Sequence, residues 1–158
     1  MTTEVSKHDT IPRKERLIVA LDVPSAEEAK KLVETLGDAV CFYKIGLELL
    51  TAGGYFEMLE CLVRCGKKVF VDLKFFDVPE TVRAAVRGLR NRGVTFVTVH
   101  GNQAMLEAAG RDKGELKILA VTVLTSLDRG DLDDLGFGCD VERLVLSRAR
   151  RALQAGCD

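Results

Sequence analysis

The sequence predicts an α/β fold built on a parallel sheet, and three observations carry that prediction. Short apolar runs rich in β-branched residues recur five times along the 158 residues. Stretches with helical periodicity separate these runs. Several of the helical stretches end at a glycine that leads directly into the next apolar run. Alternation with connections this short is typical of β-α-β units with right-handed crossovers.

The five apolar runs are each too short for a typical helix, so we interpret them as buried strands. They are residues 17–21, 40–45, 68–73, 94–99 and 117–124.

The helical stretches carry recognisable start signals. Ser25 is placed to cap the first helix, and Glu28 three residues later completes a capping box. Pro79 suits the first turn of a later helix. We expect the last helix at about residues 141–155. The acidic segment 128–134 lacks the terminal glutamate of a calcium loop, and we interpret it as a surface loop.

Periodicity leaves two architectures open, an open doubly wound sheet and a (β/α)8 barrel. The first expected strand is not followed by G-x-G-x-x-G, and G-x-x-x-x-G-K-[ST] is absent from the sequence. The nucleotide-binding versions of the open sheet therefore lose support.

Composition excludes several function classes. Lys+Arg is 23 and Asp+Glu is 24, so the chain lacks the basic excess of a nucleic-acid or membrane-surface binder. Residues 1–15 form a polar N-terminal tail without the apolar core of a secretory signal, and no apolar run is long enough to span a membrane. We therefore expect a cytoplasmic protein. The odd count of 5 cysteines, at irregular spacings, predicts reduced thiols and no metal site.

Polar side chains recur at or just past the C-terminal ends of successive expected strands. The charged ones and the histidine are Asp22, Lys44, Asp72, Lys74 and His100. In parallel α/β proteins this edge of the sheet binds ligands. Asp22 by itself is equally well a loop residue, but the repeated placement predicts a clustered polar site.

The cluster suggests a class of reaction. A lysine flanked by carboxylates is held in its charged form, which makes it a proton donor and a poor Schiff-base nucleophile. A carboxylate fixed beside it repels an anionic group of a substrate. This pattern indicates decarboxylation or enolate-type chemistry and leaves the substrate open.

Residues 72–81, with the pattern D-x-K-x-x-D, resemble the signature of the orotidine 5'-phosphate decarboxylase family. The resemblance extends to residues 17–25, 42–49, 97–100 and 119–127, and favours the bacterial form. It implies a (β/α)8 TIM barrel that converts orotidine monophosphate to UMP and CO2 without a metal or cofactor, in pyrimidine biosynthesis. D-x-K-x-x-D is shared with hexulose-phosphate synthase and ketogulonate-phosphate decarboxylase, which stay open as alternatives.

The resemblance also implies roles for the charged residues. Lys74 would protonate C6 of the pyrimidine, and Asp72 would lie beside the departing carboxylate. Lys44 would complete the charge network and touch the ribose, while Asp22 would bind a ribose hydroxyl.

Further site residues follow from the same resemblance. Asp77 and Thr81 would reach the site of a second subunit, so the implied active unit is a homodimer. Thr125 or Ser126 would contact the pyrimidine ring, and His100 would lie near the substrate.

The chain has about five βα units, whereas a (β/α)8 barrel has eight. We expect residues 16–158 to be the N-terminal portion of one barrel domain, in a C-terminally truncated enzyme. A catalytically impaired fragment is the alternative to an active decarboxylase.

Overall fold

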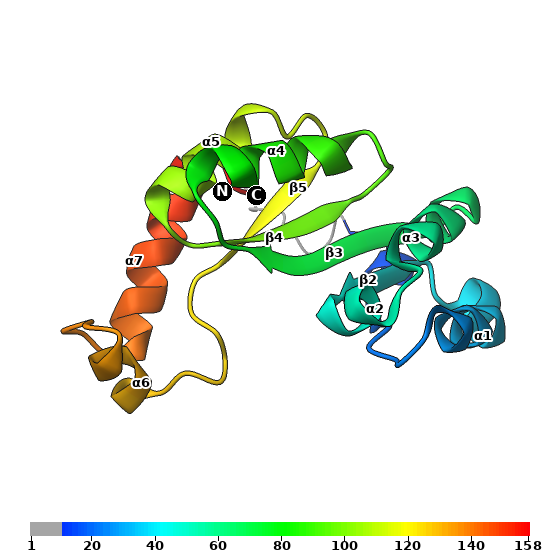
Figure 1. Ribbon diagram of the computed structural model, residues 1–158, viewed down its shortest axis with the longest axis horizontal. Coiled ribbons are helices and arrows are strands. Elements are labelled where there is room, and N and C mark those ends of the chain that lie inside the picture. Colours follow the sequence, from blue (N-terminus) through cyan, green and yellow to red (C-terminus); the bar gives the residue numbers. More distant parts are fainter. Residues whose placement is uncertain (1–10) are drawn as a thin grey trace, which may run out of the picture. The chain divides into compact units, whose positions relative to one another are not determined.

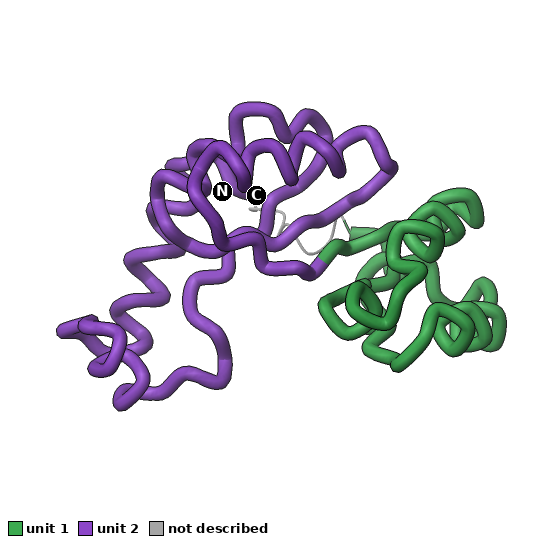
Figure 2. Tube along the Cα trace, viewed as in Figure 1, with its two compact units in different colours: residues 1–71 green, residues 72–158 purple. Residues whose placement is uncertain are grey.

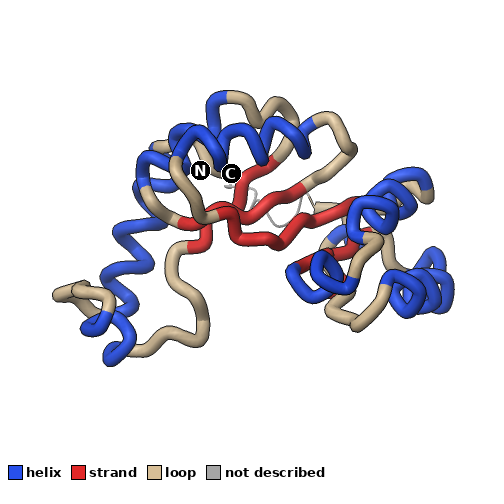
Figure 3. Tube along the Cα trace, in the orientation of Figure 1, coloured by secondary structure: helices blue, strands red, loops and turns tan. Residues whose placement is uncertain are grey.

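A computed structural model describes residues 11–158, in which five strands are hydrogen-bonded in the order β1-β2-β3-β4-β5 (Figure 1). β1 pairs in parallel with β2, and β4 pairs in parallel with β5. Helices alternate with the strands along the chain (Figure 3). The predicted α/β class is therefore confirmed. The strands are Val19–Ala20 (β1), Phe42–Gly46 (β2), Lys68–Phe75 (β3), Phe96–His100 (β4) and Lys117–Val121 (β5).

The chain divides after Val71 into two compact units, and the boundary falls inside β3 (Figure 2). The first unit holds β1, β2 and the start of β3. The second holds the end of β3 together with β4 and β5.

The first unit contains the helices α1 (Ala26–Leu36), α2 (Leu47–Ala52) and α3 (Tyr55–Arg64). Ser25 Oγ accepts a hydrogen bond from the Glu28 backbone N–H at 3.1 Å, which confirms the predicted cap of α1. Buried apolar side chains from the strands and α3 form the core. They include Leu21, Tyr43, Ile45, Met58, Leu59, Leu62, Val69 and Val71.

The short helix α2 was not expected, and a glycine makes its connection to α3 possible. Gly54 has φ 75, and a Cβ there would lie 2.9 Å from the Ala26 Cβ. A larger residue at this position therefore meets both backbone strain and a steric clash.

Residues just before β1 contact β3 and the segment before β2 within the first unit. The Lys68 ammonium lies 2.5 Å from the Glu15 carboxylate, and Cys41 Sγ donates to the Lys14 carbonyl at 2.9 Å. The proposed boundary between tail and barrel after residue 15 stays a prediction. Residues 1–10 of the expected polar tail, His8 among them, lie outside the described residues.

The second unit contains α4 (Pro79–Arg90), α5 (Gln103–Arg111), α6 (Arg129–Asp134) and α7 (Val141–Gln154). Pro79 occupies the first turn of α4, as predicted. α4 and α5 lie side by side and cover one face of β4 and β5 (Figure 1). α4 buries Val82, Val86 and Leu89.

Two expectations for the second unit are wrong. Segment 128–134 is not an irregular loop, because Asp128 and Asp131 form a reciprocal capping box that starts α6. β5 ends at Val121 rather than at residue 124, because the Thr122 carbonyl accepts a hydrogen bond from Arg148 and the chain leaves the sheet there.

Candidate functional site

The first unit carries one pair of opposite charges just past β1 and within β2. Lys44 Nζ lies 3.2 Å from both carboxylate oxygens of Asp22. The Lys44 side chain is 22% exposed and that of Asp22 is 51% exposed, so the pair lies at the surface of this unit. The structure therefore brings together two of the predicted site residues.

The second unit carries the other predicted pair at the end of β3. Lys74 Nζ donates to Asp72 Oδ1 at 2.9 Å, with side chains 36% and 13% exposed respectively. Asp72 is thus the more buried of the two partners. A carboxylate removed from water in this way depends on its hydrogen-bond donors.

The backbone of Lys74 departs from strand geometry. Its φ is 49, and Lys74 is the one non-glycine with a positive φ among residues 11–158. Strict strand alternation would place Lys74 on the same face as Phe70 and Asp72, and a left-handed residue breaks that alternation. The contact with Asp72 comes instead from a kinked backbone.

A third residue, Thr98 in β4, contacts both members of this pair. Thr98 Oγ1 donates to Asp72 Oδ1 at 2.9 Å and accepts the backbone N–H of Lys74 at 2.9 Å. Thr98 is 6% exposed and is the one polar residue in the buried set of the part described. The sequence contains one indication that Thr98 belongs to the site, because this polar residue interrupts an apolar strand two residues before His100.

Asp77 and Thr81 lie at the start of α4, and both are exposed. Asp77 Oδ1 accepts the Val78 backbone N–H at 2.6 Å. These two residues and Lys74 line one hollow of about 290 Å³. The structure therefore places three predicted site residues around the same space in the second unit.

His100 ends β4 and is in edge contact with Phe76, with ring centroids 5.0 Å apart. Burial lowers the pKa of His100, and the nearby charges of Arg148 and Lys74 lower it further. The neutral imidazole is therefore the favoured form. His100, Phe76 and Arg148 line a mostly apolar hollow of about 510 Å³.

The run RARR at residues 148–151 is typical of a solvated helix face, but Arg148 departs from that pattern. Arg148 Nη1 donates to the Thr122 carbonyl at 2.6 Å, and its guanidinium lies 5.1 Å from the centre of the Phe137 ring. Arg150 and Arg151 are exposed as expected. Helical spacing turns Arg148 toward β5 and away from those two residues.

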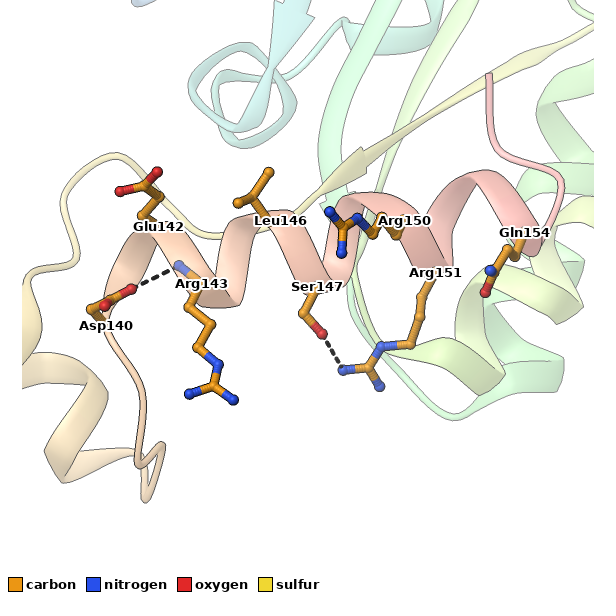
Figure 4. A pocket seen from close by; sticks show the side chains of 8 residues that line it. All are labelled: Asp140, Glu142, Arg143, Leu146, Ser147, Arg150, Arg151 and Gln154. Atoms are coloured by element: carbon orange, nitrogen blue, oxygen red, sulfur yellow. Dashed lines mark hydrogen bonds between the residues drawn. The ribbon is translucent and has the colours of Figure 1, made fainter.

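A hollow of about 600 Å³ runs along α7, and Arg143, Arg150 and Arg151 border it (Figure 4). Arg151 donates to Ser147 Oγ at 3.0 Å there. The hollow contains none of the predicted site residues, and its lining comes from α7 and its cap, Asp140. It is a surface feature of one helix.

Thr125 and Ser126 are exposed in the turn that follows β5. The turn closes through the Leu127 N–H, which donates to the Leu124 carbonyl at 3.0 Å. Within the described part of the second unit, no hydrogen bond joins these two hydroxyls to Lys74 or Asp72. Their predicted contact with a pyrimidine stays a prediction.

Among residues 11–158, no group of three or more His, Cys, Asp or Glu side chains is arranged to hold a metal ion. The five cysteines are free thiols. No helix within the described range has both the length and the apolar character needed to cross a membrane.

Comparison with solved structures shows which architecture the five strands belong to. An orotidine 5'-phosphate decarboxylase from Lactobacillus acidophilus aligns with a TM-score of 0.83 at 34% identity, covering 90% of this chain and 68% of that chain. An uncharacterized conserved protein from Geobacillus kaustophilus aligns with a TM-score of 0.83 at 33% identity, covering 89% and 70%. The chain therefore has five βα units of a (β/α)8 barrel.

Sequence comparison gives the family. The chain is 68% identical to an orotidine 5'-phosphate decarboxylase from Methylococcus capsulatus over 94% of its own length and 61% of the relative's length. It is 52% identical to one from Rhodopseudomonas palustris, over 92% and 62%. The chain thus spans about three fifths of the curated relatives it matches. A model of the orotidine 5'-phosphate decarboxylase / HUMPS family matches residues 15–158, so the chain belongs to that family.

Proposed function

We propose that this chain acts in the decarboxylation of orotidine monophosphate to UMP and CO2, in pyrimidine biosynthesis. The observation that carries the proposal is the Lys74–Asp72 pair, in which an ammonium and a half-buried carboxylate lie 2.9 Å apart at the end of β3. This pair supplies both a proton donor and a fixed negative charge. The fixed negative charge favours expulsion of a substrate carboxylate, and the proton donor neutralises the electron pair left on carbon.

In the proposed reaction the bond between C6 of the pyrimidine and its carboxylate breaks, and the electron pair stays on C6. CO2 leaves, and Lys74 Nζ transfers a proton to C6. Solvent then restores the proton of Lys74. Asp72 repels the substrate carboxylate before the bond breaks and holds the Lys74 ammonium afterwards, so its effect is larger in the transition state than in the ground state.

We assign the other predicted residues to substrate binding. Lys44 and Asp22 contact the ribose, and their mutual ion pair at 3.2 Å holds the lysine in place. Thr125 or Ser126 contacts the pyrimidine, and His100 lies near the substrate. No cofactor takes part.

We further propose that the active unit is a cytoplasmic homodimer in which Asp77 and Thr81 complete the partner's site. Phe76 and Val78, on either side of Asp77, are 67% and 64% exposed. Apolar side chains this exposed beside a charged residue favour burial in an interface. The five free thiols accord with a reducing compartment.

The test is UMP formation, followed by the loss of orotidine absorbance, in two proteins. One is the 158-residue chain. The other is a chimera in which this chain replaces the matched segment of the Methylococcus capsulatus relative. We expect turnover by the chimera and none by its Lys74→Ala variant. A chimera that folds as a dimer and forms no UMP would overturn the proposal.

A further inference from the structure

The hydroxyl of Thr98 ties together the two residues of the proposed proton-donating pair. It lies 2.9 Å from Asp72 Oδ1 and 2.9 Å from the backbone nitrogen of Lys74. Asp72 Oδ1 also accepts Lys74 Nζ at 2.9 Å. The three groups therefore form a closed ring of hydrogen bonds across β3 and β4.

The chemistry of the partners fixes the direction of each bond. A backbone N–H only donates, so Thr98 Oγ1 accepts from Lys74. An ionised carboxylate only accepts, so the single hydroxyl proton of Thr98 goes to Asp72. The one donor of the Thr98 hydroxyl and one of its two acceptor positions are thus used, and both bonds go to the members of the ion pair.

The hydrogen bond from the Lys74 backbone N–H to Thr98 matters because the backbone of Lys74 is strained. A non-glycine residue at φ 49 costs roughly 1–2 kcal/mol relative to ordinary backbone. Such a conformation persists where surrounding contacts impose it, and strained residues of this kind cluster at functional sites. The Thr98 hydroxyl supplies one such contact from a rigid strand, at a position that is 6% exposed.

We propose that Thr98 is the positioning residue for proton transfer: its hydroxyl fixes the left-handed backbone of Lys74 and orients the Asp72 carboxylate, and it touches no substrate atom. This inference rests on the proposed function, because the proton transfer it serves is that of the decarboxylation. Its geometric part is independent of any activity.

The test compares Thr98→Val, which keeps the branched shape and removes the hydroxyl, with Thr98→Ser, which keeps the hydroxyl. Thr95→Val is the matched control, because it removes a hydroxyl just before the opposite end of β4. The first measurement is amide hydrogen exchange in the 158-residue chain. We expect exchange of the Lys74 amide to rise at least tenfold in Thr98→Val and to stay within about twofold of wild type in the other two variants.

The Gly101 amide, which donates to the Val121 carbonyl at 2.9 Å, reports on general loosening of the second unit. If exchange of the Gly101 amide also becomes faster in Thr98→Val, the whole unit has loosened, and Thr98→Ser is then the variant that decides. The positioning role predicts that this variant keeps the protection of the Lys74 amide. Two results would overturn the claim that the Thr98 hydroxyl fixes the Lys74 backbone. One is loss of protection of the Lys74 amide in Thr98→Ser, and the other is unchanged exchange of that amide in Thr98→Val.

The second measurement is steady-state kinetics in whichever protein turns over orotidine monophosphate. Hydrogen bonds to charged groups are worth enough to predict a fall in kcat of about 10- to 100-fold in Thr98→Val, with KM changed less than about threefold. Thr98→Ser restores kcat. A raised KM with unchanged kcat would overturn the positioning role. Absence of turnover in the unmutated proteins would count against the proposed function and leave the exchange result to decide the geometry.

Discussion

Lys44 Nζ is equidistant from the two carboxylate oxygens of Asp22, at 3.2 Å from each, and the Asp22 side chain is 51% exposed whereas that of Asp72 is 13% exposed. An exposed pair adds little to stability because water competes for both charges. We therefore expect this pair to contribute little to the stability of the fold, and we propose that its role lies in ligand binding.

Asp22→Asn tests this division of roles. We expect the free energy of unfolding to change by less than about 1 kcal/mol, because the pair is exposed. KM for orotidine monophosphate is expected to rise, because Asp22 is assigned to a ribose hydroxyl. Glu27→Gln is the control, since Glu27 forms a similar exposed pair with Lys31 at 2.8 Å. An equal rise of KM in both variants would remove Asp22 from the site.

Lys74→Ala is expected to abolish turnover while the chain stays folded. Loss of a general acid costs about 10²–10⁴-fold in rate. Lys68→Ala is the control, because Lys68 begins the same strand and pairs with Glu15 instead. Rates are measured by UMP formation and folding by circular dichroism. Turnover near the unmutated rate in Lys74→Ala would exclude Lys74 as the proton donor.

Mixing Asp77→Ala protein with Lys74→Ala protein tests the shared site. If Asp77 completes the partner's site, each mixed dimer has one intact site. Random exchange of subunits makes half of the dimers mixed, so activity is expected to recover to about a quarter of the unmutated value. Activity that stays at the sum of the two separate variants would place Asp77 in the site of its own chain.

His100 predicts a pH dependence of stability. Its pKa is lower in the folded chain than the ordinary 6.5, so the unfolded chain binds more protons as the pH falls through that value. The free energy of unfolding is therefore expected to decrease as the pH falls below about 6.5, until His100 protonates in the folded chain. Urea titrations at several pH values measure the slope.

His100→Gln is expected to reduce that slope, and His8→Gln, which changes the other histidine of the chain, serves as the control. Identical slopes in His100→Gln and the unmutated chain would show that other groups control stability in this range.

Substitution of glycine by alanine is expected to have opposite effects on stability at positions 101 and 88. A Cβ at Gly101 would lie 2.9 Å from the Val121 carbonyl oxygen and 3.4 Å from Arg148 Cδ, so Gly101→Ala is expected to destabilise by about 1–3 kcal/mol. A Cβ at Gly88, inside α4, would meet nothing within 4 Å. Gly88→Ala is therefore expected to stabilise by about 0.5–1 kcal/mol. Thermal unfolding of the two variants in parallel checks both signs.

The order of strands and helices was predictable because each element carries its own local signal. The cap at Ser25 and the proline at position 79 mark helix starts, and the short apolar runs mark strands. The capping box of α6 was also present in the sequence, at Asp128 and Asp131. It was missed because clustered aspartates are equally common in loops.

The site was predictable only in its charges. The recurrence of charged residues at strand ends indicated a polar cluster, but it did not indicate that Asp22 pairs with Lys44 and Asp72 with Lys74. The part played by Thr98 depends on the register between β3 and β4, which no local pattern encodes. The left-handed backbone of Lys74 was equally hidden, because lysine has no preference for that region.

That backbone has a consequence for protein engineering. At position 74 the chain holds a charged residue in a conformation that glycine or asparagine adopts at lower cost. In a library screened for heat resistance alone, relief of this backbone strain favours replacement of the proposed acid, whereas loss of a donor to the Asp72 carboxylate opposes it. Directed evolution of this fold has to select for turnover and thermal tolerance together.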